Sequence, residues 1–404
     1  MPEFSQIPPL SLYIHFPWCI RKCPYCDFNS HAIRENAFPE EAYLDALLAD
    51  LDQEIPRIKH REVMSIFMGG GTPSLFSDSG INRLLAAISK RVALSGDCEI
   101  TLEANPGSVE AGRFQGFRDA GVNRLSIGVQ SFADDQLCKL GRVHDSQAAS
   151  AAIEQAQAAG FDNINLDLMF ALPRQAPEQA LEDLRRALVF NTSHLSWYQL
   201  TIEPNTQFYS SPPALPDSDT SWHMQELGTA FLHIGGLTQY EVSAYAHNGR
   251  QCRHNLNYWQ FGDYLGLGAG AHGKITDPAG GKITRYIRHR IPERYMKLAG
   301  NTGVIIETRE LSVDDIRLEF MMNALRLNDG VCIELFESRT GLSIKQIAGE
   351  IEKAVARRLL VDDPERIMAT PSGRQYLNEL LELFMDDSPG PARGRYQPHQ
   401  KHQE

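Results

Sequence analysis

The sequence predicts an α/β protein: a partial barrel of six β–α units followed by a smaller helical domain. Short apolar runs alternate with amphipathic stretches over the first 250 residues, which is typical of parallel strands joined by helical crossovers. The units are regular in length, and polar residues recur where the expected strands end. Both features favour a barrel, while a flavodoxin-like or Rossmann sheet stays open on periodicity alone.

The first expected unit sets the pattern for the others. Leu12–Phe16 is a short apolar run and predicts a strand, and the leucines of Ala42–Glu54 recur at helical spacing on one face. The next strand and helix pairs are expected at 63–68 and 80–92, 99–103 and 109–120, 124–129 and 146–159, 163–169 and 177–190, and 195–201 and 221–234, with one more strand at 240–246.

The pattern changes after about residue 305. Helices are expected at 313–327, 332–338, 343–358 and 371–384, with a short hairpin formed by 359–361 and 366–369. We therefore divide the chain into a barrel domain at 1–304, a helical domain with a small β-wing at 305–385, and a disordered tail at 386–404. The second domain carries 10 Lys and Arg against 15 Asp and Glu, which argues against DNA binding.

Composition indicates a soluble protein of the reducing cytoplasm. The 404 residues are 42% hydrophobic and 22% charged, and no run is long and apolar enough to span a membrane. The start, MPEFSQIPPL, lacks the features of a secretory signal. Seven cysteines do not form a disulfide-dense pattern. The net charge of −12 weakens the case for a nucleic-acid partner.

Cys19, Cys23 and Cys26 form a CxxxCxxC array directly after the first strand. Three thiolates this close can hold three corners of a [4Fe–4S] cluster, which needs four ligands. Structural zinc is the less favoured alternative, because it normally requires a second cysteine pair. The remaining cysteines are scattered singly, at Cys98, Cys138, Cys252 and Cys332. The pattern therefore indicates a cluster with one iron open to a non-protein ligand.

Groups suited to an amino-acid-plus-nucleoside ligand follow the next strands. Glycines allow backbone amides to approach a ligand, a strand-end carboxylate can accept hydrogen bonds from ribose hydroxyls, and an arginine can pair with a carboxylate. S-adenosylmethionine (SAM) is such a ligand, and its amino and carboxylate groups could chelate the open iron. The residues are Gly70, Gly71, Thr72, Glu103, Gln130, Arg142 and Asp167.

The cysteine array with its GGGTP loop resembles the radical SAM superfamily. LYIHFPWC, EANPGS, GVQSF and NLDLMFALP more closely resemble the oxygen-independent coproporphyrinogen III oxidase group, over roughly residues 10–385. The resemblance implies a winged-helix-like C-terminal domain. The oxidases bind two SAM molecules, and whether a second one binds here stays open. The implied SAM contacts are Tyr13, Tyr25, Gly70, Gly71, Thr72, Glu103, Gln130, Arg142 and Asp167.

Two departures from the oxidases, and one further motif, resemble their haem chaperone branch, HemW. Phe28 stands where the oxidases carry another cysteine, and only ten residues precede the first strand. His254 opens an HNLNYW segment that matches the HNxxYW motif associated with haem binding. A neutral imidazole is a common axial iron ligand, and Tyr258 and Trp259 could face a porphyrin. A packed histidine is the structural alternative, and Cys252 is a second candidate ligand.

The resemblance implies a haem chaperone rather than an enzyme. Its cofactors would be a SAM-ligated [4Fe–4S] cluster and haem, and its partner a haem acceptor of unknown identity. A radical SAM oxidoreductase acting on a porphyrinogen or another substrate is the alternative, while an RNA-modifying enzyme fits the acidic charge poorly. Peripheral membrane contact stays possible, as do a monomer and a homodimer. The glycine-rich segment 261–273 is expected to be irregular and to lie near the active-site mouth.

Overall fold

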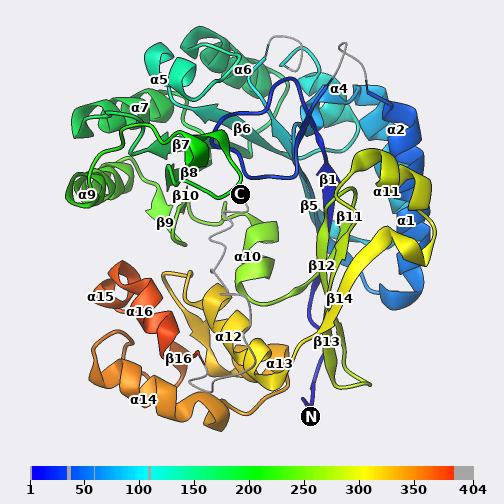
Figure 1. Cartoon of the computed structure of the whole chain (residues 1–404), viewed down its shortest axis with the longest axis vertical. Helices are drawn as coiled ribbons and strands as arrows, with labels where there is room; N and C mark the ends of the chain where they lie inside the picture. Colours follow the sequence, from blue (N-terminus) through cyan, green and yellow to red (C-terminus); the bar gives the residue numbers. More distant parts are fainter. Residues whose placement is uncertain (1, 34–37, 59, 108–110, 386–404) are drawn as a thin grey trace.

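Six neighbouring parallel strands form the centre of a twelve-stranded sheet (Figure 1). This computed structural model describes residues 2–33, 38–58, 60–107 and 111–385. The predicted partial barrel is confirmed, because these six strands pair in chain order. They are β1 (Leu10–Phe16), β4 (Val63–Gly70), β5 (Leu94–Ala104), β6 (Arg124–Gln130), β7 (Ile164–Phe170) and β8 (His194–Gln199).

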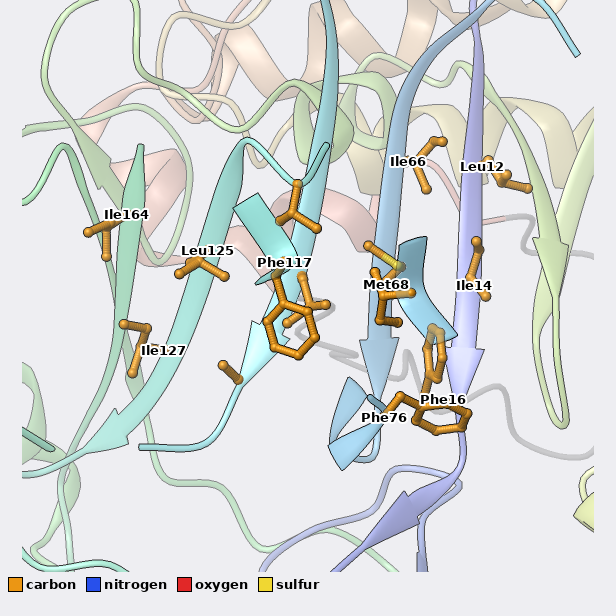
Figure 2. Close-up of a cluster of buried hydrophobic side chains, with 14 of the residues drawn as sticks. Leu12, Ile14, Phe16, Ile66, Met68, Phe76, Phe117, Leu125, Ile127 and Ile164 are labelled. Carbon is orange, nitrogen blue, oxygen red and sulfur yellow. The ribbon is translucent and has the colours of Figure 1, made fainter. Parts of the chain in front are cut away.

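Helices cover the outer face of the curved sheet (Figure 1). Alternate residues of β1 and β4 point outward, and Figure 2 shows Leu12, Ile14, Ile66 and Met68 together in this outer core. The helices are α1 (Glu40–Ile58), α2 (Asp78–Ser89), α4 (Phe114–Asp119), α5 (Asp134–Lys139), α6 (Ser146–Ala158), α7 (Pro177–Val189) and α9 (Ser218–Ile234), with a 3₁₀ turn η1 (Pro73–Leu75). The short α8 (Gln207–Ser210) lies instead against the cysteine loop, because the Phe208 amide donates to the Pro24 carbonyl oxygen.

The glycine-rich segment is more regular than expected. It contains β11 (Asp263–Leu267), which pairs in parallel with β1, so the prediction of an irregular segment was wrong. Gly266 explains this, because a Cβ there would lie 1.8 Å from the carbonyl oxygen of His272. Three antiparallel strands then extend the sheet, and α11 (Pro292–Leu298) lies before the last of them. The three are β12 (His272–Asp277), β13 (Lys282–Arg288) and β14 (Ile305–Glu310).

The other sheet edge also differs from expectation. The strand expected at 240–246 is only β10 (Ala244–Ala246), which is antiparallel to β8 and pairs with β9 (Thr238–Gln239). Glu241 is drawn away from that strand, because it forms a β-bridge with Leu327 and a salt bridge with Arg326. The start of the expected strand therefore joins the sheet to the C-terminal domain.

The C-terminal helices surround a second apolar core. The expected wing is present as a two-stranded pair and a bridge between Leu360 and Ala369. The helix expected at 343–358 begins as a 3₁₀ turn, and the one expected at 371–384 divides at Tyr376. The elements are α12 (Val313–Ala324), β15 (Val331–Cys332), α13 (Ile333–Thr340), η3 (Ile344–Ile347), α14 (Ala348–Ala356), β16 (Arg366–Ile367), α15 (Pro371–Gln375) and α16 (Leu377–Glu382).

One short helix, α10 (Arg253–Trp259), lies between the barrel and the C-terminal helices (Figure 1). The Arg326 guanidinium lies 4.2 Å from the ring centroid of Trp259 and so links α10 to that domain. The domain division at 304 and 305 stays a prediction, and β14 pairs in the main sheet on the C-terminal side of it. The tail at 386–404 lies outside the described residues. Within the described chain, no helix has the length and apolar character of a membrane span.

Candidate functional site

Two polar regions occupy opposite ends of the barrel interior. Parallel strands share one direction, so their carboxyl ends meet at one rim and their amino ends at the other. The expected cluster and SAM residues belong to the carboxyl rim and the middle of the strands. The HNLNYW segment packs against the amino ends, where Ser11 of β1 pairs with Ser65 of β4.

The three array cysteines lie in the loop after β1 and are half-buried and reduced. The first is in β2 (Trp18–Cys19), a two-residue strand that pairs with β3 (His31–Ala32) and so closes the loop. The Thr72 hydroxyl donates to the Cys19 sulfur at 3.5 Å, and the Arg142 guanidinium donates to the Cys23 sulfur at 3.6 Å. The loop therefore brings two sulfurs within reach of side chains from two other loops, the one after β4 and the one after α5.

The thiols are not assembled as a closed ligand set. No group of three or more His, Cys, Asp or Glu side chains in the described part of the chain is arranged to hold a metal ion. Burial raises the pKa of the Cys19 thiol, and it raises the pKa of Cys26 to about 11. Without a metal both would be protonated at neutral pH, so loading a cluster would release protons. The donor set fits a cluster chemically, and the cluster site stays a prediction from spacing.

Arg142 is the centre of the network beside the cysteine loop. It is half-buried, and it donates to the side-chain oxygen of Asn105 at 2.6 Å and to the carbonyl oxygen of Gly128 at 2.9 Å. Asn105 in turn donates to the Thr72 hydroxyl at 2.9 Å. The Nε atom of Arg142 is buried and forms no hydrogen bond with the described residues. The network therefore holds the guanidinium in place with one donor still to satisfy.

Two carboxyl groups lie on β5 and β7, where Asp167 is buried and Glu103 is half-buried. Glu103 accepts a hydrogen bond from the Gly70 amide at 3.0 Å, and burial followed by repulsion from Asp167 raises its pKa to about 8. Burial also raises the pKa of Asp167 to about 6, against hydrogen bonds from Ser126 and Asn165. A carboxylate held away from water lowers the free energy of unfolding. Such groups occur more often in ligand-binding sites than in purely structural positions.

The remaining expected SAM residues line the same rim. Gly71 has to be glycine, because a Cβ there would lie 2.6 Å from the Trp18 carbonyl oxygen. Gln130 ends β6 with a φ of 68°, and its side-chain oxygen accepts from the Tyr198 hydroxyl at 2.7 Å. Tyr25 is half-buried. The HNLNYW residues do not belong to this group, because they lie at the amino ends of the strands. The structure therefore brings the SAM candidates together, and leaves their roles as predictions.

Sequence reasoning missed a chain of residues that supports the cysteine loop. The Nε2 atom of His15 lies 2.9 Å from the Asn29 carbonyl oxygen, so this nitrogen must carry the proton. Its Nδ1 atom then accepts from the Tyr13 hydroxyl at 2.9 Å. Asn29 donates to the carbonyl oxygens of Ala269 and Arg290, both at 2.8 Å. The alternation of Ser11, Tyr13 and His15 along β1 was the signal available in the sequence.

His254 is packed at the amino end of the barrel. It is 3% exposed, its ring stacks on Phe67 with centroids 5.0 Å apart, and Tyr258 lies 5.2 Å away. Burial lowers its pKa to about 3, so the imidazole is neutral. Ser65 donates its hydroxyl proton to Ser11, so His254 Nδ1 must donate to Ser65 at 3.1 Å. The lone pair is therefore on Nε2, the atom a haem iron would need.

The other candidates in that segment are packed as well. Cys252 is fully buried, its sulfur lies 3.5 Å from a Glu99 carboxylate oxygen, and burial raises its thiol pKa to about 12. The rings of Tyr258 and Tyr264 stack with centroids 4.1 Å apart. The only direct link to the carboxyl end that we find among described rings is Tyr13, whose centroid is 6.4 Å from that of His254.

Comparisons with known proteins agree with this geometry. The model of the radical SAM superfamily matches residues 13–187, and that of the HemN C-terminal domain matches residues 311–376. The chain is 48% identical over 386 residues to the haem chaperone HemW of Haemophilus influenzae, covering 95% of this chain and 99% of that protein. It is 49% identical to HemW of Escherichia coli, covering 94% and 99%. The chain belongs to the HemW family.

Two further relatives share less sequence with this chain. HemW of Bacillus subtilis is 35% identical, over 93% of this chain and 99% of that one. The coproporphyrinogen III oxidase HemN of Escherichia coli superposes with a TM-score of 0.79 at 24% identity, covering 94% of this chain and 90% of its own. That likeness shows the fold alone. As a member of the radical SAM superfamily, this HemW-family protein uses a [4Fe–4S] cluster and SAM.

Proposed function

We propose that this protein is a haem chaperone, which binds haem and transfers it to an acceptor protein while carrying a SAM-ligated [4Fe–4S] cluster. The observation that carries this is the likeness to proteins named haem chaperones along nearly the whole chain, at 48% and 49% identity. The HNLNYW segment and Phe28 support it, because both resemble the chaperone branch rather than the oxidases. We place the protein in the cytoplasm, as a monomer or homodimer.

The cofactor residues have distinct proposed roles. Cys19, Cys23 and Cys26 would hold three irons of the cluster. Arg142, with its unsatisfied Nε, would pair with the SAM carboxylate. The buried carboxyl groups would face the sulfonium and the ribose, which offsets the cost of their burial. The full set of proposed SAM contacts is Tyr13, Tyr25, Gly70, Gly71, Thr72, Glu103, Gln130, Arg142 and Asp167.

His254 is the proposed haem ligand. Its support is a neutral ring with the lone pair on Nε2. Its ring is enclosed by Phe67, Tyr13 and Tyr258, so a haem would reach it only after α10 moves. Gly249 before α10 and Phe261 after it have φ values of 75° and 56°, which are the positions where such a movement would turn. Cys252 is the alternative ligand.

A radical SAM oxidoreductase is the second candidate. The complete carboxyl-end set favours it, since Glu103, Arg142 and Asp167 are all retained. The substrate would be a porphyrinogen, as in the oxidases, or another molecule. Phe28 argues against the oxidase reaction, because it replaces a cysteine of that group.

Anaerobic reconstitution separates the two functions. The holoprotein is titrated with ferric haem and, in parallel, assayed with coproporphyrinogen for decarboxylation and release of 5′-deoxyadenosine. A chaperone binds haem stoichiometrically and leaves coproporphyrinogen unchanged. Its haem affinity should fall at least about tenfold in His254→Ala. Turnover coupled to 5′-deoxyadenosine release would establish the enzyme instead. His223→Ala, an exposed histidine of α9, is the matched control.

A further inference from the structure

Two neighbouring polar side chains inside the barrel lack a hydrogen-bond partner. Thr101 of β5 and Arg124 of β6 lie opposite each other in the register of the sheet. They are 0% and 2% exposed, and the Oγ1 atom of Thr101 and the Nε atom of Arg124 form no hydrogen bond with the described residues. A buried donor without an acceptor lowers the free energy of unfolding. Two such donors side by side therefore indicate a ligand that the protein takes up.

Both side chains face the barrel interior. Residues alternate between the two faces of a strand, and the next residues along, Leu102 and Leu125, belong to the outer core, where Figure 2 shows Leu125. The charge of Arg124 also opposes the rise in the pKa of Asp167, in which burial is the largest effect. The guanidinium therefore lies inside the barrel, within electrostatic reach of the expected SAM site.

The two donors lie at the level of the proposed haem ligand. Phe67 of β4 pairs with Thr101, so Phe67, Thr101 and Arg124 form one row across three strands. The ring of His254 stacks on Phe67 with centroids 5.0 Å apart, and the Arg124 charge is second to burial in lowering the pKa of His254. Two strand spacings, about 10 Å, separate β4 from β6. This is comparable with the separation between the iron of haem and its propionate carboxylates, so one such molecule spans the row.

The carboxylate beside this row is engaged elsewhere. Glu99 of β5 is buried, and its Oε1 atom accepts from the His254 amide at 3.2 Å and from the Cys252 thiol at 3.5 Å. Its charge acts on Arg124 without a hydrogen bond between the two side chains in the part of the chain that the structure describes. Arg124 therefore keeps its donors for an acceptor from outside the protein.

We propose that Thr101 and Arg124 form a carboxylate site that binds a propionate of the haem held by His254. A guanidinium and a hydroxyl side by side can donate to the two oxygens of one carboxylate. The inference rests on the haem binding of the proposed function, and it adds the residues that recognise the acidic arms of the porphyrin. Arg142 remains the proposed partner of the SAM carboxylate, so the two arginines serve different ligands.

The test compares haem with haem dimethyl ester, in which both propionates are esterified. The reconstituted protein is titrated with each at saturating SAM, and the wild type should bind the free acid at least about tenfold more tightly. Arg124→Met should lose this preference and keep the absorption spectrum of haem ligated by His254. Arg124→Lys should keep part of the preference, because it retains the charge and loses the planar fork. Thr101→Val removes a buried hydroxyl at nearly constant shape, so it should fold and lower the preference a few fold.

The matched control is Arg118→Met, which removes the same charge from an exposed position of α4 and should keep the wild-type preference. Equal affinity of the wild type for acid and ester, or a preference that Arg124→Met and Thr101→Val both retain, would overturn the site. If Arg124→Met does not fold, Thr101→Val decides. Loss of SAM binding in Arg124→Met with the preference intact would assign this arginine to SAM instead.

Iron-free protoporphyrin IX and its dimethyl ester separate the site from the proposed function, because neither needs a bond to His254. A preference for the free acid that depends on Arg124 supports the site even if haem itself fails to bind, a result that would count against the haem chaperone alone. Stoichiometric haem binding without any preference for the free acid would overturn the site and leave the chaperone standing. Binding of neither porphyrin would overturn both.

Discussion

The two ends of the barrel hold polar side chains in different ways. At the carboxyl end, polar groups are arranged at a cost in free energy, because Glu103 and Asp167 have raised pKa values and Arg142 Nε has no hydrogen-bond partner among the described residues. At the amino end, polar side chains pair around Asp263, although Arg124 Nε and Trp259 Nε1 have no hydrogen-bond partner among the described residues. Asp263 there accepts from Arg61, Lys274 and Thr276, all within 3.1 Å. We infer that the carboxyl end receives a ligand, whereas the amino end joins strands, α10 and the C-terminal domain.

The largest expected effect is the loss of the cluster when one of the array cysteines is replaced. Cys19→Ser should abolish the cluster, because the array supplies only three thiolates and the cluster needs all of them. Iron content and visible absorption after anaerobic reconstitution measure this. Haem binding to the same variant should persist, since His254 is at the opposite end. Cys138→Ser, an exposed cysteine of α5, should keep its iron. Equal loss of iron and haem would show that the two ends do not act separately.

Asp263→Ala tests the amino end. Its side chain is fully buried, and removing it leaves the Lys274 ammonium and part of Arg61 without their carboxylate. Breaking a buried pair from one side costs about 3–5 kcal/mol of unfolding free energy. The midpoint of urea unfolding reports this loss. Asp97→Ala removes an exposed ion pair with Arg253 and should leave the urea midpoint close to that of the wild type. A small effect at Asp263 would contradict the structural role of this end.

At the carboxyl end, Glu103→Gln should raise the free energy of unfolding, whereas Asp263→Ala should lower it. The folded pKa of about 8 lies above the unfolded value, so Glu103 binds more protons when folded, and wild-type stability falls as pH rises from 4.5 to 8. Above that range the variant should be more stable by roughly 2–4 kcal/mol. Its SAM affinity should fall. Urea unfolding and SAM titration across pH measure both changes; a destabilised variant that binds SAM normally would sink the distinction.

The two ends also differ in how much of their structure could be predicted from the sequence. The array of Cys19, Cys23 and Cys26 was readable because its spacing is local. The parallel strand order followed from repeated units, and the comparisons confirm the fold. The contact between Ser65 and His254 joins residues 189 positions apart, and no pattern within one segment predicts it. β11 was missed for a related reason: glycines usually indicate loops, and here Gly266 is required by the approach of β12.

The smallest effect concerns the protonation of His254. Its folded pKa of about 3 lies below the ordinary value of 6.5, so the unfolded chain binds the extra proton, and stability is lost as pH falls from 6.5. By about pH 4 the wild type should lose roughly 2–3 kcal/mol more than His254→Gln, whose amide cannot ionise. Urea unfolding at each pH measures the difference, and His223→Gln serves as the control because that ring is exposed. Adding haem at neutral pH sharpens the result. If α10 opens to present His254, haem should raise the urea midpoint of the wild type and not that of His254→Gln, whereas a ring that stays packed against Phe67 would let haem act equally on both proteins.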